Sequence, residues 1–138
     1  YFHGIAPGHY QVLAIDPRAV IANNNLAWIY AEAGNDLEFA LGLAQVAMEQ
    51  APEEPEVMDT IAWVYYKKSL PERAIPLFES CVKKAPTNPT YHLHLGLAYL
   101  KAGRSAQART SLQRALANNP NTPTANDAKR ALAQIGPG

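Results

Sequence analysis

The chain has 138 residues, enough for one domain with a hydrophobic core of its own. Its 12 lysine and arginine residues balance its 12 aspartate and glutamate residues, which argues against nucleic-acid binding and against a polybasic membrane-surface segment. No run of about 18 apolar residues is present, so this fragment is not expected to insert into a membrane, and the single cysteine excludes an internal disulfide.

Landmark residues recur along the chain at a nearly fixed interval, which indicates an internal repeat. The prolines of this series are spaced 35, 34 and 34 residues apart: Pro17, Pro52, Pro86 and Pro120. Small residues and tyrosines keep the same interval: Ala27, Ala62 and Gly96, and Tyr30, Tyr65 and Tyr99. The one extra residue falls in the stretch "EAGNDLEFA", whose Gly-Asn-Asp composition is typical of a turn that tolerates an insertion.

In chain order, residues 1–19 are interpreted as a partial preceding repeat, because "GHYQVLAIDP" resembles the second helix of such a unit. Three full repeats follow at residues 20–54, 55–88 and 89–122. Residues 123–135 are expected to form a capping helix whose outer face is polar, as helical arrays need for solubility.

Each repeat is predicted to consist of two helices. In the middle repeat, one apolar stripe at helical spacing comprises Met58, Ile61, Ala62 and Tyr65. Pro71 suits the first turn of the second helix, where its missing N–H does no harm. The facing stripe of that helix comprises Ala74, Phe78, Cys81 and Val82.

This pattern resembles the tetratricopeptide repeat family, a 34-residue helix–turn–helix with these landmarks. The segment "YHLHLGLAYLKAGRSAQARTSLQRALANNP", residues 91–120, is close to the family pattern over its whole length. The resemblance implies an all-α, right-handed α-solenoid of helix–turn–helix repeats. The wording around the two tryptophans also resembles repeats of large bacterial proteins of this family, which implies a bacterial cytoplasm, periplasm or cell envelope as the location.

The side chains that could perform catalysis or bind a metal do not form a recognisable motif. His92 and His94 are two residues apart, so on a helix they point about 200° apart and cannot chelate one ion. Cys81 stands where the next repeat has Ala115, which favours a small buried residue over a reactive thiol. We therefore expect no catalytic residue, no metal site and no cofactor, and hence no enzyme.

Function in a helical solenoid is expected on the concave surface, which the first helix of each repeat lines. At 100° per residue, the side of these helices that points away from the core carries Trp28 and Trp63, which are 35 residues apart. The residues predicted to line a peptide-binding groove are Asn24, Trp28, Asp59, Trp63, Tyr66, Lys67, Leu93, Leu97, Leu100 and Lys101.

Three interpretations of this surface remain open. The leading one is a scaffold that binds an amphipathic or apolar protein segment, because exposed tryptophan and tyrosine are favoured anchors. A second is self-association through the same strip or through exposed repeat ends. In the third, neighbouring helices or further repeats cover the side chains. Some family members clamp acidic C-terminal tails, and Asn24 would suit such a clamp, but Asp59 and Leu93 occupy its other positions and disfavour it.

Overall fold

The computed structural model describes residues 16–117 and 120–136, and every regular element within these ranges is an α-helix. The helices are α1 (Pro17–Ala33), α2 (Leu37–Gln50), α3 (Pro55–Lys67), α4 (Pro71–Lys84), α5 (Pro89–Lys101), α6 (Ser105–Leu116) and α7 (Pro123–Ile135). The predicted all-α fold is confirmed. No helix in these ranges is long and apolar enough to cross a membrane. The partial repeat predicted for residues 1–19 lies mostly outside the described residues.

Local sequence signals explain where the helices begin. Five of the helices have proline in their first turn, where the missing N–H leaves no hydrogen bond unmade. Side chains before several helices cap the free backbone N–H groups; the Asn88 side chain, for example, accepts from the N–H of Thr90 at 2.9 Å. Asp16 accepts from the N–H of Arg18 in the same way, at 3.0 Å. Helix α1 therefore begins at Pro17, three residues before the predicted start of the first repeat.

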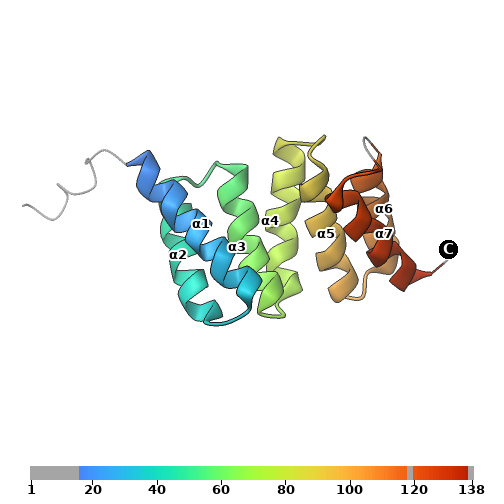
Figure 1. Ribbon diagram of the computed structural model, residues 1–138, viewed down its shortest axis with the longest axis horizontal. Helices are drawn as coiled ribbons and strands as arrows, with labels where there is room; N and C mark the ends of the chain where they lie inside the picture. The colour runs from blue at the N-terminus through green and yellow to red at the C-terminus, as the bar shows by residue number, and fades with distance from the viewer. Residues whose placement is uncertain (1–15, 118–119, 137–138) are drawn as a thin grey trace, which may run out of the picture.

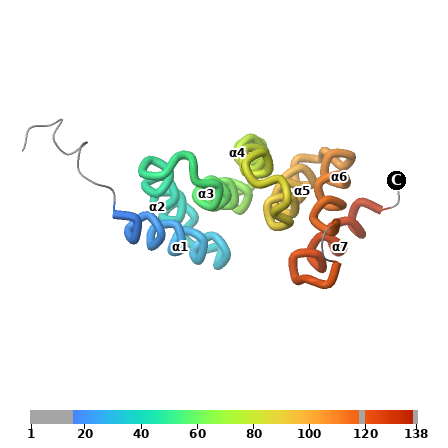
Figure 2. Tube along the Cα trace, turned by 90° about the horizontal axis from the view of Figure 1, so that it is seen from above, coloured from blue at the N-terminus to red at the C-terminus, as the bar shows by residue number. Residues whose placement is uncertain are grey.

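The helices form antiparallel pairs, α1 with α2, α3 with α4 and α5 with α6, that follow one another along the long axis of the molecule (Figure 1). The second helix of each pair also packs against the first helix of the next, so the pairs form a continuous array. Helix α7 packs against both α5 and α6. The view in Figure 2 shows the same succession from above. The predicted helical-repeat solenoid is therefore confirmed.

Each first helix carries a buried small residue at the same position of the repeat. Ala27 and Ala62 have no exposed surface, and Gly96 is buried at the same position of the third repeat. A Cβ atom added to Gly96 would lie 2.7 Å from both Cγ and Cδ2 of Leu112 on α6, closer than two carbon atoms can approach. Phe78 of α4 and Leu112 of α6, the large side chains of the second helices, are fully buried.

Helix α7 buries a stripe of small residues and exposes charged ones. Ala125, Ala128 and Ala131 are at most 3% exposed, whereas Lys129 and Arg130 face solvent. Arg109 of α6 donates to the backbone oxygen of Gly136 at 3.0 Å and fixes the end of α7. An apolar inner side and a polar outer side are the features expected of the capping helix.

We predict that Gly96→Ala lowers the free energy of unfolding by about 1–2 kcal/mol, because overpacking at Leu112 outweighs the higher helix propensity of alanine. Gly42→Ala is the matched control. Gly42 lies inside α2 with no atom within 4 Å of an added Cβ, so this change should raise the free energy of unfolding by about 0.5–1 kcal/mol. Urea unfolding measures both. Equal stabilisation by the two variants would show that the close approach at Gly96 imposes no constraint.

Candidate functional site

An aromatic cluster joins the first helices of the three repeats. Trp28 of α1, Trp63 and Tyr66 of α3 and His94 of α5 form it, with Trp63 at the centre. The Trp63 ring centroid lies 5.5 Å from that of Trp28, 4.7 Å from that of Tyr66 and 4.4 Å from that of His94. Rings at these separations gain attraction beyond the burial of apolar area. The two tryptophan positions predicted from the repeat are thus in direct contact.

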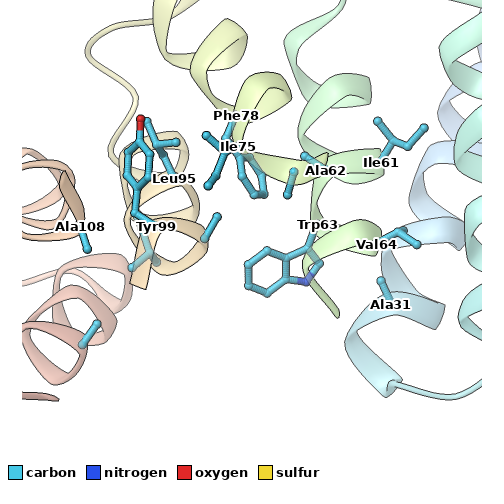
Figure 3. Packing of buried hydrophobic residues seen from close by; sticks show 14 of the residues in the cluster. Ala31, Ile61, Ala62, Trp63, Val64, Ile75, Phe78, Leu95, Tyr99 and Ala108 are labelled. Carbon is cyan, nitrogen blue, oxygen red and sulfur yellow. The ribbon is translucent and has the colours of Figure 1, made fainter. Parts of the chain in front are cut away.

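Trp63 is mostly enclosed by this packing. Only 8% of its surface is exposed, and its indole N–H donates to Oε1 of Glu32 at 2.6 Å. In the view of Figure 3 its ring lies below Ala62, with Val64 to the right and Tyr99 to the left. Trp28 and Tyr66 are only half-buried. The accessible aromatic surface of the cluster is therefore contributed mainly by these two residues.

A buried polar contact holds α3 and α5 together next to the aromatic cluster. His94 Nδ1 lies 2.7 Å from Oδ1 of Asp59, and the two side chains are 7% and 10% exposed. The His94 ring also packs against Phe78 of α4, with centroids 5.6 Å apart. His92 is separate: its Nε2 lies 2.7 Å from the backbone oxygen of Pro86. Both histidines have structural partners, and they do not share one.

Three of the predicted groove residues, Asp59, Trp63 and Leu93, are buried in the structure, at 7%, 8% and 5% exposure. In the structure, neighbouring helices cover these three side chains, as in the third of the interpretations given above. The angular position of a residue on its own helix does not show which side chains of neighbouring helices cover it. On α3, for example, the ring of His94 from α5 lies against Trp63, and its Nδ1 contacts Asp59. The other seven remain at least partly exposed: Asn24, Trp28, Tyr66, Lys67, Leu97, Leu100 and Lys101.

Two lysines stand over the aromatic cluster at the C-terminal ends of α3 and α5. Lys101 Nζ lies 3.8 Å from the Tyr66 ring centroid and donates to the Tyr66 backbone oxygen at 3.0 Å. Lys67 Nζ lies 5.7 Å from the Trp63 ring centroid. Burial, together with the nearby charge of Lys67, lowers the pKa of Lys101. This end of the surface is cationic, and both lysines favour the negative end of the helix dipole.

At the opposite end of the first helices, two hollows form what we call the trough. The first, of about 440 Å³, lies between α1, the end of α2 and the start of α3. The second, of about 480 Å³, lies between α1, α3 and α5, with Trp28 and His94 in its lining. Asn24, Asn25 and Glu56 line both hollows, so the two hollows adjoin each other, and the second reaches the aromatic cluster at Trp28 and His94. Of the polar residues that line the trough, Asn24 and Asp59 were among the predicted groove residues.

Cys81 belongs to the core. It has no exposed surface, and its thiol donates a hydrogen bond to the backbone oxygen of Pro55, with an Sγ–O distance of 3.3 Å. Burial, followed by the charge of Asp59, raises the pKa of the thiol to about 12, so it is protonated at neutral pH. Within residues 16–117 and 120–136, no group of three or more His, Cys, Asp or Glu side chains is placed to hold a metal ion.

Sequence comparison identifies a family pattern over much of the chain. The pattern described as tetratricopeptide repeat matches residues 65–135, just over half of the chain. Human N-alpha-acetyltransferase 25, the NatB auxiliary subunit, is 31% identical over 86 residues, which cover 60% of this chain. The match spans only 9% of that much longer protein.

Two solved structures with bound peptides share the fold. The first tetratricopeptide domain of Spaghetti (RPAP3), bound to the HSP90 peptide SRMEEVD, has a TM-score of 0.75 at 17% identity and covers 88% of this chain and 93% of its own. The Yersinia enterocolitica chaperone SycD, in complex with a peptide of the translocator YopD, has a TM-score of 0.74 at 16% identity and covers 89% and 96%. At these identities the likeness concerns the arrangement of the helices.

We predict that the free energy of unfolding falls as the pH rises from about 9 to about 12. Burial raises the pKa values of Cys81, Tyr91 and Tyr99 to about 12, whereas the unfolded chain ionises these groups at about 8.5 to 10. The three groups have higher pKa values in the folded chain than in the unfolded chain. Their contribution to the free energy of unfolding is therefore complete when the pH is below the unfolded pKa values, and it is lost as the pH rises toward the folded ones. Urea unfolding at a series of pH values measures the decline.

Cys81→Ala is the control for this pH dependence, because the next repeat has Ala115 at this position. It should remove the earliest part of the decline, which begins near the unfolded cysteine pKa of about 8.5. A free energy of unfolding that stays constant from about pH 8 to about pH 11 would contradict the prediction, since it would mean equal ionisation in both states.

Proposed function

Because the chain belongs to the tetratricopeptide repeat family, we propose that it is a non-enzymatic protein-interaction module that binds an apolar or amphipathic protein segment along its first helices. The observation that carries this proposal is that the half-exposed ring of Trp28 lines the second hollow of the trough, while the half-exposed ring of Tyr66 belongs to the same aromatic cluster through Trp63. A preformed hollow next to aromatic anchors is the usual form of a peptide-binding surface. The peptides held by the RPAP3 and SycD domains support the same use of this fold.

Apolar side chains continue the surface in both directions from Trp28. Ile21 and Ile29 are each 58% exposed and line the first and second hollows respectively. Leu97 and Leu100 of α5 are partly exposed and pack against the core that contains Trp63. A helix or extended segment laid across α1, α3 and α5 would remove these side chains from water, and this burial would drive binding.

The test starts from a phage-displayed library of random peptides selected on the immobilised chain, and the enriched peptides are then synthesised. We predict that Trp28→Ala/Tyr66→Ala weakens their binding at least about thirtyfold, because one buried aromatic anchor is worth about 2 kcal/mol. Titration calorimetry gives the dissociation constants. In the wild type, the fluorescence of the chain's two tryptophans should change on binding, since both lie at the site.

Phe39→Ala is the matched control for loss of an aromatic side chain. Phe39 is 44% exposed on α2 and packs on Tyr30, outside the trough, so binding should be unchanged. Circular dichroism verifies that all variants keep their helices. Failure to select any peptide, or binding that the double variant leaves intact, would contradict the proposed groove.

Self-association is a second candidate function, because exposed apolar side chains concentrate on the first helix pair. The large hydrophobic residues exposed in the described part of the chain are Ile21, Leu26, Ile29, Phe39, Val46 and Leu70, and only Leu70 lies outside α1 and α2. The positions equivalent to Leu26 and Ile29 on α3 are Ile61 and Val64, which are 6% and 0% exposed. On α3 the preceding helix pair covers this side, so on α1 a second copy could take that place.

If identical chains pair through this side of α1, sedimentation velocity over a concentration series should show a dimer, and Leu26→Glu should return it to a monomer. Leu26 is 39% exposed and does not line the trough, so peptide binding by this variant should be retained. A wild-type chain that stays monomeric at every concentration would eliminate self-association while leaving the peptide groove unaffected.

A further inference from the structure

We infer that the trough receives a lysine or arginine side chain of the bound segment, between the carboxylates of Glu54 and Glu56 and the side-chain oxygen of Asn24. This inference rests on the proposed function and adds to it the charge of the partner. It reverses the charge preference of family members that hold acidic tails.

The charged residues of the trough have one sign. Among the described residues, the acidic side chains that line the two hollows are Glu54, Glu56 and Asp59, and no lysine or arginine lines either hollow. Asp59 is already engaged by His94 at 2.7 Å. The carboxylates of Glu54 and Glu56 make no hydrogen bond or ion pair with any residue that the structure describes, which leaves both free to accept from a ligand.

Helix capping does not account for these carboxylates. Glu54 occupies the position before the first turn of α3, where a side-chain oxygen usually accepts from a backbone N–H, but it makes no such bond. Glu56 lies in the first turn and gains from the helix dipole, an effect that requires no specific contact. Their oxygens thus remain available in the wall of the trough.

Two buried acceptors in the first hollow lack donors. Oδ1 of Asn24 and Oε1 of Gln50 are inaccessible to solvent and have no hydrogen-bond partner among the described residues. An unsatisfied buried acceptor is destabilising, so a rotation that turns either oxygen toward a donating ligand in the hollow would favour binding. A guanidinium offers five N–H donors and an ammonium three, which suits a site with several acceptor oxygens.

Apolar side chains complete the first hollow. Val20 and Val57 are 8% and 4% exposed, and Ile21 stands at the open side. Lysine and arginine bury their methylene stems against such surfaces while their charged heads reach polar groups. The hollow therefore matches both parts of a long cationic side chain.

The negative field extends to the second hollow. Burial raises the pKa of Tyr91, which lines it, to about 12, and the charges of Asp59, Glu56 and Glu54 add to this shift. Lys67 and Lys101 stand at the other end of the same surface. A bound segment would accordingly be oriented with its basic residue at Glu54 and Glu56 and its apolar residues toward the aromatic cluster.

The chain's own residues 1–15, "YFHGIAPGHYQVLAI", contain no lysine or arginine. Charge complementarity therefore favours a segment of another protein as the occupant of the trough.

The experiment uses the peptides selected on the intact chain, and basic residues should be enriched at one position beside apolar ones. Replacing that residue by its neutral isostere, citrulline for arginine, should weaken binding about tenfold, the effect of about 1.4 kcal/mol from charge-assisted hydrogen bonds. The variant Glu54→Gln/Glu56→Gln should bind the arginine peptide about tenfold more weakly, yet no longer distinguish it from the citrulline peptide.

Glu38→Gln/Glu49→Gln is the control, because it changes the net charge equally at exposed positions of α2 outside the trough. It should leave both dissociation constants unchanged. Peptides that need Trp28 and Tyr66 but bind equally well with citrulline would overturn this inference and leave the groove intact. Displacement of the selected peptides by a synthetic peptide of residues 1–15 would also overturn it, since that occupant contains no lysine or arginine. Absence of any selected peptide would remove both proposals.

Discussion

The arrangement of the molecule depends on how closely the two helices of each repeat can approach. Each first helix carries one buried small residue at this contact, Ala27, Ala62 or Gly96, and in the third repeat it lets the side chain of Leu112 on the second helix lie against the backbone. At Gly96 even one methyl group would overlap Leu112. Because this contact sets the rotation of each first helix, the residues on its other side project toward a common surface, and the trough and the aromatic cluster form there.

The tryptophan that first suggested a binding surface is mostly a structural residue. Trp63 lies between α1, α3 and α5, with its N–H satisfied by Glu32 and its ring enclosed by aromatic neighbours. The His94–Asp59 contact closes the same space from α5. A packed interior of this kind holds Trp28 and Tyr66 in fixed positions, so the proposed binding surface would be preorganised and would lose little entropy on binding.

Negative and positive side chains lie at opposite ends of this surface, and each helix accounts for its own part of this distribution. Acidic residues near the start of α3 and lysines at the ends of α3 and α5 each lower the energy of the helix that carries them, through the helix dipole. Because the first helices run side by side, these separate preferences add across the array. One end of the trough is thereby negative and the far end of the aromatic cluster is positive, a pattern that would give the proposed bound segment one favoured orientation.

The sequence by itself determined the repeat length, the helix pairs and the small-residue contacts, because each depends on spacing within one helix or on the exact recurrence of landmarks such as Pro52 and Pro86. It also identified Trp28 and Tyr66 as partly accessible. Only the tertiary structure decided that Trp63 and Leu93 are covered, that Asp59 pairs with His94, and that Glu54 and Asn24 share a hollow. These features join residues on different helices, and the distance between their side chains depends on how successive repeats are rotated against each other, which no spacing along the chain specifies.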